Sequence, residues 1–185
     1  MDRTENRDTD ETLKFVLSQQ MDIVKLSTDW AKAEVFSAKI VWLFSAIEII
    51  AAIGFWYWGK TVMAKAFIWP LMVAGLFVAA VGTGLYFANN PRITRFETEY
   101  RGNPDAFLQE EIQRTAESKK ELALVFKILP AIIIFAAIGI LLLPPSLWRA
   151  IAITIIITAA FLMIVDSNTE ARNNVYNSHL SSLKP

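Results

Sequence analysis

The sequence predicts an all-α integral membrane protein with four transmembrane helices and helical cytoplasmic extensions. The first observation is composition: 54% of the 185 residues are hydrophobic, and the mean hydropathy of +0.38 is higher than soluble domains usually reach. The second is distribution, because the apolar residues gather in four runs of about 20 residues, each enough to cross a hydrocarbon core about 30 Å thick. The third is that no run shows the two-residue alternation of a membrane β-barrel strand.

The N-terminal segment is predicted to form one long helix that continues into the first span. No Gly or Pro interrupts residues 10–53. We therefore predict one helix from about Thr12 to Trp56. It covers most of a cytoplasmic N-terminal segment, 1–39, and most of the first span, 40–58. Its wide apolar face favours packing in a bundle; a helix lying on lipid is the alternative, which the acidic polar face disfavours. A heptad-like, coiled-coil-type stripe crosses the boundary in phase through Leu17, Met21, Val24, Thr28, Ala31, Val35, Ala38 and Trp42.

An external link over 59–65 leads to the second span, 66–88, and a cytoplasmic helical loop follows over 91–123. Asn90-Pro91 and Asn103-Pro104 are helix start signals, with Asn as the cap and Pro as the first helical residue. Gly102 is expected to end the first of the two loop helices. One face of that helix carries three large apolar side chains, Ile93, Phe96 and Tyr100.

The third span is predicted over 124–143 and the fourth over 147–165, joined by an external link over 144–146. Pro130 should kink the third span or free a carbonyl group. The cytoplasmic tail, 166–185, keeps helical spacing. We expect the three cytoplasmic extensions to pack together as a helical stalk.

The distribution of Lys and Arg predicts the orientation in the membrane. Fifteen of these residues lie in the N-terminal segment, the middle loop with the first turn of the third span, and the tail. The opposite side has three, Lys60, Lys65 and Arg149. The excess predicts that both termini are cytoplasmic in the inner (plasma) membrane. The polar, acidic first 36 residues lack the features of a cleavable signal, so the first span is expected to remain as an anchor.

Glu48 is the strongest candidate for an intramembrane functional group. It lies near the middle of the first span, where a charged carboxylate costs about 2.5–3.5 kcal/mol. Ser45 shares its helical face. Two interpretations remain open: Glu48 binds an ion or proton, or it holds helices together by a hydrogen bond. Its possible partners are Thr158, Thr83 and Lys127, of which Lys127 is also placed to reach the cytoplasmic surface.

The second span carries a helix-packing face of small residues, Gly75, Ala79 and Gly82, at i, i+4 and i+7. Such a face lets two helix backbones approach closely. The sequence leaves open whether it meets another span or another subunit.

The composition argues against most kinds of catalytic and metal-binding site. The chain has no cysteine, and its single imidazole, His179, lies in the polar tail. It contains no GxxxxGK[ST], HExxH or GxSxG motif, so we expect no enzymatic activity, no cofactor and no metal site. The 18 basic and 18 acidic residues balance, which argues against nucleic-acid binding.

Two functions remain. The first is a non-enzymatic protein that acts through protein contacts of its membrane and cytoplasmic helices, as an accessory subunit, scaffold or immunity-type protein. Its partners would be the lipid bilayer and either further copies of itself or another membrane protein. The alternative is a homo-oligomeric ion channel or ion-coupled transport protein with Glu48 on the path.

Overall fold

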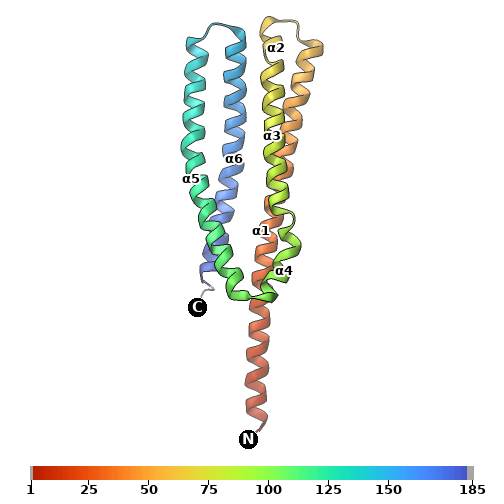
Figure 1. Cartoon of the computed structure of the whole chain (residues 1–185), viewed down its shortest axis with the longest axis vertical. Coiled ribbons are helices and arrows are strands. Elements are labelled where there is room, and N and C mark those ends of the chain that lie inside the picture. The colour runs from red at the N-terminus through yellow and green to blue at the C-terminus, as the bar shows by residue number, and fades with distance from the viewer. Residues whose placement is uncertain (1, 183–185) are drawn as a thin grey trace.

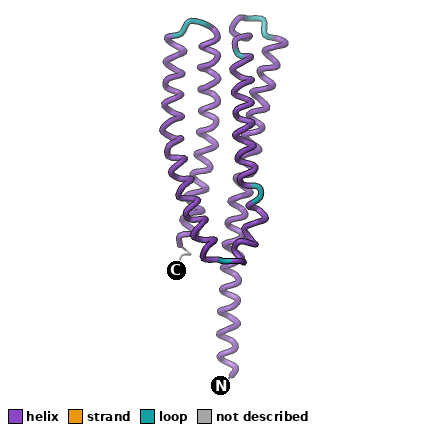
Figure 2. Tube along the Cα trace, in the orientation of Figure 1, coloured by secondary structure: helices purple, strands orange, loops and turns teal. Residues whose placement is uncertain are grey.

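The computed structural model describes the backbone of residues 2–182 and the side chains of residues 21–182, and this part of the chain contains helices but no strand. Figure 1 shows both ends of the chain at the same end of the bundle and two hairpin turns at the opposite end. Links between helices are short (Figure 2). The helices are α1 (Asp2–Trp58), α2 (Val62–Ala66), α3 (Ile68–Asn89), α4 (Arg92–Gly102), α5 (Pro104–Leu142) and α6 (Ser146–Ser182).

Helix α1 confirms the prediction of one continuous helix through the N-terminal segment and the first apolar run. It has 57 residues, or about 85 Å at 1.5 Å per residue. Its N-terminal part extends beyond the other helices (Figure 1). The predicted stripe is only partly correct: Ala31, Val35 and Ala38 are buried, whereas Met21 is 68% exposed. Leu17 falls outside the described side chains.

The link after α1 differs from the simple connection predicted over 59–65, because it contains the short helix α2. Thr61 caps this helix by accepting a hydrogen bond from the backbone N–H of Ala64 at 3.1 Å. Helix α3 starts two residues after α2 ends.

One predicted start signal of the middle loop is confirmed and the other is wrong. Asn103 has an extended backbone and its side chain accepts from the N–H of Ala106 at 3.1 Å, with Pro104 as the first residue of α5. Asn90 instead has helical dihedrals, and its N–H bonds to Tyr86 O. A cap residue needs non-helical dihedrals, so Asn90 extends the hydrogen-bond ladder of α3 instead of capping α4.

The helices form two hairpins, α1–α3 and α5–α6, and contacts within each hairpin far exceed those between them. Two glycines permit the close approach in the first hairpin. A Cβ on Gly75 would lie 2.7 Å from Ile49 Cγ1 and 3.2 Å from Ser45 O, and one on Gly82 would lie 2.7 Å from Trp42 Cδ1. The small-residue face therefore packs against α1 of the same chain.

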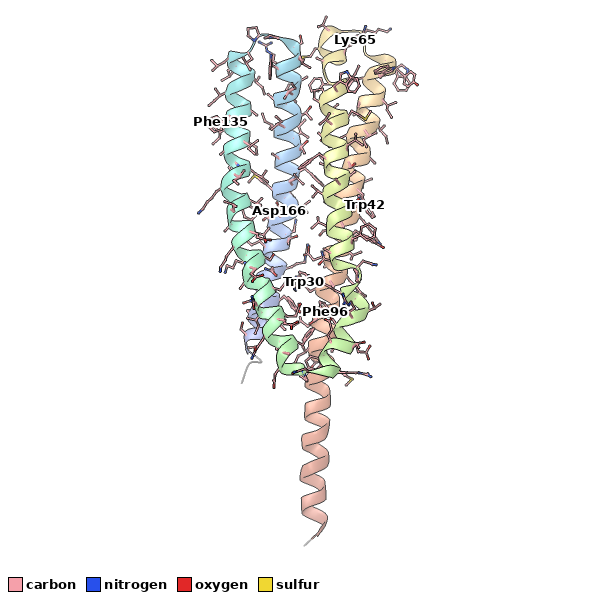
Figure 3. The ribbon with its side chains drawn as sticks, in the orientation of Figure 1. Trp30, Trp42, Lys65, Phe96, Phe135 and Asp166 are labelled. Carbon is pink, nitrogen blue, oxygen red and sulfur yellow. The ribbon has the colours of Figure 1, made fainter. Side chains whose placement is uncertain are left out.

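The lower part of the bundle, which we call the stalk, comprises residues 21–39 of α1, all of α4, residues 104–123 of α5 and residues 166–182 of α6. Phe96 and Tyr100 of α4 are buried, as the apolar face predicted. Trp30 and Phe96 lie inside the stalk, far from Lys65 at the opposite end (Figure 3). The core of the stalk consists of Ile23, Trp30, Ala31, Phe96, Tyr100, Phe107, Leu108, Tyr176 and Leu180.

The remaining part, the apolar half, comprises residues 40–58, 62–88, 124–142 and 146–165. Its outer surface is hydrophobic: Phe135 and Leu141 are 74% and 82% exposed, and Figure 3 shows Phe135 pointing away from the bundle. Four helical stretches of the described chain are long and apolar enough to cross a membrane, with mean hydropathies of 1.9, 2.0, 2.7 and 2.3 in their most apolar windows.

We predict that Gly75→Ala destabilises the protein while Gly84→Ala does not. The new methyl group at position 75 has backbone atoms of α1 within 3.3 Å, which cannot move as a flexible side chain can. Overpacking of this kind costs about 1–3 kcal/mol, more than the roughly 1 kcal/mol that Ala gains over Gly in a helix. No atom lies within 4 Å of the corresponding Cβ at Gly84, so this substitution is the matched control. Thermal unfolding in detergent measures both, and equal transition temperatures would contradict close packing at Gly75.

Candidate functional site

Glu48 lies at the contact between the two hairpins. It projects from α1 and is only 3% exposed. Thr158 Oγ1 of α6 donates a hydrogen bond to Glu48 Oε1 at 2.6 Å. The second carboxyl oxygen, Oε2, has no hydrogen-bond partner. The partner is thus one of the three residues that the sequence suggested.

This contact belongs to a longer row, which we call the α1–α6 seam. On α1 the row consists of Ser27, Glu34, Val41 and Glu48, which repeat every seven residues and are all buried. Residues seven apart lie on one face of a helix after two turns. The row is therefore a narrow strip about 32 Å long at 1.5 Å per residue, which turns by about 20° around the helix with each repeat.

Helix α6 supplies a contact for each of the four seam residues of α1. The two helices are antiparallel (Figure 1), so seam residues with higher numbers on α1 contact residues with lower numbers on α6. Tyr176 Oη lies 2.8 Å from Ser27 Oγ, Arg172 Nη2 lies 2.9 Å from Glu34 Oε1, and Thr158 bonds Glu48. Between the last two levels, Val41 and Val165 share a small apolar core with Val78 of α3.

The Glu34–Arg172 ion pair is the charged level of the seam. Glu34 has a side chain that is 4% exposed, against 30% for Arg172. Arg172 also donates to Ser37 Oγ at 2.8 Å, and Thr169 Oγ1 lies 3.4 Å from Glu34 Oε2. The carboxylate is therefore bonded at both oxygens, which compensates for much of its lost hydration.

A second polar cluster links α5 to the seam inside the stalk. Arg114 makes two hydrogen bonds to Glu111, of 2.9 and 2.6 Å, and its guanidinium group lies 4.0 Å from the centre of the Trp30 ring. Tyr176 donates to Glu111 Oε2 at 2.8 Å and stacks on Trp30 at 5.4 Å. Burial, together with the neighbouring Glu111 carboxylate, raises the pKa of the Tyr176 hydroxyl, so this group stays a neutral donor.

Ser45 and the small-residue face tie α1 to α3. Ser45, 4% exposed, donates to the carbonyl oxygen of Gly75 at 2.7 Å. One and two turns further along α3, Thr83 Oγ1 donates to Ala79 O at 2.7 Å and accepts from Trp42 Nε1 at 3.2 Å. These bonds bring most of the predicted site residues to one interface within the chain.

Lys127 is not part of this site. Its side chain is exposed on α5, and no ion pair joins it to Glu48. Helix α5 continues through Pro130, so the proline does not end the helix.

Sequence reasoning found Glu48 but missed the seam to which it belongs. Ser27, Glu34 and Ser37 are polar residues for which the sequence alone indicates no burial, yet all three are buried. The sequence does contain one signal for the seam, because Ser27, Glu34 and Glu48 fall on the same heptad position. It is weak in isolation, since their partners on α6 lie 110 to 149 residues away.

Among the described residues, no group of three or more His, Asp or Glu side chains could hold a metal ion. Comparisons with protein-family models, with curated proteins and with solved structures find no match for this chain. The arrangement of the site therefore carries the functional argument.

We predict a strong coupling between Glu48 and Thr158 in stability. Thr158→Val leaves a buried carboxyl group without its donor and should cost about 1–3 kcal/mol. Glu48→Leu leaves the buried Thr158 hydroxyl without its acceptor and should cost a similar amount. The double variant Glu48→Leu/Thr158→Val removes both polar groups and should recover most of the loss. Thermal unfolding of the purified variants gives the cycle, and additive effects would show that the bond contributes nothing.

Proposed function

We propose that this chain is a multi-pass protein of the plasma membrane, with its apolar half in the bilayer and its stalk and both termini in the cytoplasm. The four apolar helices and their hydrophobic outer surface support the placement. The fifteen-to-three distribution of basic residues supports the orientation. Aromatic side chains at the hairpin turns support a membrane boundary there, since Trp56, Trp58, Trp69 and Trp148 are all more than half exposed.

Within the membrane, we infer a contact role without enzymatic chemistry, as an accessory subunit, a scaffold or an immunity-type protein. The observation that carries this proposal is the burial of Glu48 against Thr158 of the same chain. The group best placed to conduct or catalyse is thus occupied in joining the two hairpins. The two buried carboxylates of the stalk, Glu34 and Glu111, are likewise paired, with Arg172 and Arg114 respectively.

The surfaces left for a partner are the outer face of the apolar half and the face of the stalk between α1 and α4. The stalk face contains a groove of about 570 Å³ that carries both signs of charge, including Lys25, Asp29, Lys32, Glu97 and Arg101. A mixed-charge, partly apolar groove of this kind is typical of protein contacts, where complementary charge gives specificity.

A homo-oligomeric channel or ion-coupled transporter is the second candidate. It is favoured by one observation, the missing hydrogen-bond partner of Glu48 Oε2, which an ion or proton could supply. One carboxyl group per chain supplies too few polar groups to line a pore, so this function requires several copies of the chain around an axis. Glu48 faces α6 inside the bundle, which favours the contact role.

The proposed orientation predicts the accessibility of single cysteines. The chain has no native cysteine, so each introduced thiol reports alone. Lys60→Cys and Ser146→Cys should react with a membrane-impermeant maleimide added to intact cells. Gln109→Cys should react only after the cells are opened. External labelling at position 109 would contradict the proposed orientation.

The contact role predicts the same background ion flux in proteoliposomes that contain wild type and Glu48→Gln. Gln keeps the shape and hydrogen bonding of Glu but cannot ionise. Flux in the wild type that disappears in the variant, with an unchanged elution profile, would establish the transport function instead. The subunit count in nanodiscs is the companion measurement, because a ring with Glu48 at its axis would also contradict the contact role.

A further inference from the structure

A polar groove runs between α5 and α6 in the part of the stalk that adjoins the apolar half. These helices pack side by side in the second hairpin (Figure 1). The groove, which we call the α5–α6 groove, has a volume of about 370 Å³, at the lower end of the range for small-molecule sites. Thr115 and Asn173 are buried at its base, whereas Lys119, Lys120 and Asn174 are exposed at its rim.

The polar groups at the base are occupied by bonds between the two helices. Asn173 Nδ2 donates to Thr115 O at 2.9 Å, and Asn177 Nδ2 donates to Thr115 Oγ1. The carbonyl oxygen of Asn173 has no partner, but it is shielded from the surface of the groove. A ligand in the groove would therefore be bound from the rim, by the two ammonium groups and the amide of Asn174.

The two lysines differ from most basic residues of the stalk, because neither forms an ion pair with a described residue. Five other basic side chains of the stalk each lie within 4 Å of a carboxylate on the same helix or on a neighbouring one. These are Lys32, Arg95, Arg101, Arg114 and Arg172. Lys119 and Lys120 thus present two uncompensated positive charges side by side.

The acidic residues of α5 near these lysines point away from the groove. Glu117 and Glu121 are each two residues from Lys119, which places them about 160° around the helix from it at 3.6 residues per turn. Glu117 also accepts a hydrogen bond from Gln113 at 2.9 Å.

On α6, the acidic residue closest to the groove is Glu170. It lies one turn from Asn174 and about level with Lys119, but it neither lines the groove nor pairs with either lysine among the described residues. Asp166 lies farther along α6. Burial, together with the carboxylate of Glu34, raises the pKa of Asp166, so this residue faces the seam. Glu170 is therefore the one carboxylate that opposes an anion at the rim.

The proposed membrane placement puts both lysines at the depth of phospholipid headgroups. Lys119 and Lys120 precede residue 124, where the apolar half begins on α5, by five and four residues, or about 7.5 and 6 Å. The polar layer on each side of a bilayer is roughly 5–7.5 Å thick. A ligand at the rim would therefore lie among the lipid headgroups of the cytoplasmic leaflet.

The outer surface of α5 continues from the groove as a strip with two kinds of side chain. Lys120, Lys127, Ile134 and Leu141 repeat every seven residues and so lie along one side of the helix. Lys127 is exposed, and its long side chain can reach back to the headgroup layer. Ile134 and Leu141 are 59% and 82% exposed. The strip is thus cationic at the headgroup level and apolar above it, which matches the two parts of a phospholipid.

The charge of the rim distinguishes between classes of phospholipid. A phosphate diester accepts charge-assisted hydrogen bonds from ammonium groups. In a zwitterionic phospholipid, the ammonium group of the headgroup would be held beside three lysines, and like charges repel. An anionic phospholipid has no such group. Basic pockets between membrane helices on the cytoplasmic side bind anionic headgroups for the same reason.

We propose that the α5–α6 groove binds the phosphate group of an anionic phospholipid of the cytoplasmic leaflet. Lys119 and Lys120 bind the phosphate, Asn174 donates to it from α6, and the acyl chains lie along Ile134 and Leu141. The site rests on the membrane placement proposed above, but it is independent of the contact role.

Native mass spectrometry of the purified full chain in a neutral detergent tests the site. Titration with palmitoyl-oleoyl phosphatidylglycerol gives the Kd of the first bound lipid. The Kd for phosphatidylcholine with the same acyl chains should be about fivefold higher or more. Lys119→Gln/Lys120→Gln should raise the Kd for phosphatidylglycerol about 25-fold, since each lysine near the surface contributes about fivefold. Both side chains are exposed and unpaired, so an unchanged elution profile is expected.

Three further variants separate this site from a general effect of charge. Lys60→Gln/Lys65→Gln removes the same charge at the opposite end of the bundle and should leave the Kd unchanged. Lys119→Arg/Lys120→Arg keeps both charges and should bind within about twofold of the wild type. Glu170→Gln removes the opposing carboxylate and should lower the Kd.

The proposal is overturned by equal Kd values for the two lipids, or by equal losses in the two double Gln variants. Displacement of the lipid by an equal concentration of inorganic phosphate, at constant ionic strength, would also overturn it and make the groove a site for soluble phosphate. Membrane fractionation of cells tests the placement separately. A chain in the soluble fraction would remove the basis of both proposals, whereas a membrane-bound chain with equal Kd values would remove only this one.

Discussion

The α1–α6 seam is the constraint on which the rest of the bundle depends. Each hairpin has its own close packing, and the two hairpins meet through the apolar core of the stalk and along the seam, which adds three polar contacts at fixed positions. Removing one member of a buried polar pair costs more than the pair contributes, because the other member keeps its desolvation penalty. The arrangement of the hairpins is therefore fixed less by the strength of these bonds than by the cost of leaving any of them open.

The seam also determines the register of the two helices. Glu34 and Glu48 are two heptads apart on α1, and both find their donors only at one alignment of α6. A shift of one turn, about 5.4 Å, would separate both carboxyl groups from their partners. Apolar packing alone tolerates such shifts, because one leucine or alanine layer resembles the next. Polar residues in an otherwise apolar helix contact commonly specify alignment in this way at some cost in stability.

The fold class and most helix boundaries were predictable because they depend on local signals. Long apolar runs, the Asn103-Pro104 start and the end at Gly102 are each readable within a few residues of sequence. Asn90 shows the limit of such signals, since a cap exists only if the preceding helix stops, and α3 does not stop there. The seam cannot be predicted from residues that are close together in the sequence. A glutamate at position 34 looks like solvated surface until the arginine 138 residues later is brought against it.

The separation of the seam partners along the chain has a consequence for biogenesis. The first hairpin is complete when residue 89 has been made, yet the donor for Glu48 is residue 158 and the donor for Glu34 is residue 172. At 5–20 residues per second, the ribosome needs roughly 3–14 s to add the 69 residues from 89 to 158. In the proposed membrane placement, a first hairpin inserted during that interval holds the Glu48 carboxyl group in an apolar environment without its partner. A chain whose last helix is missing or misplaced would stay in this condition, and the unpaired carboxyl group would distinguish an incomplete molecule from a finished one.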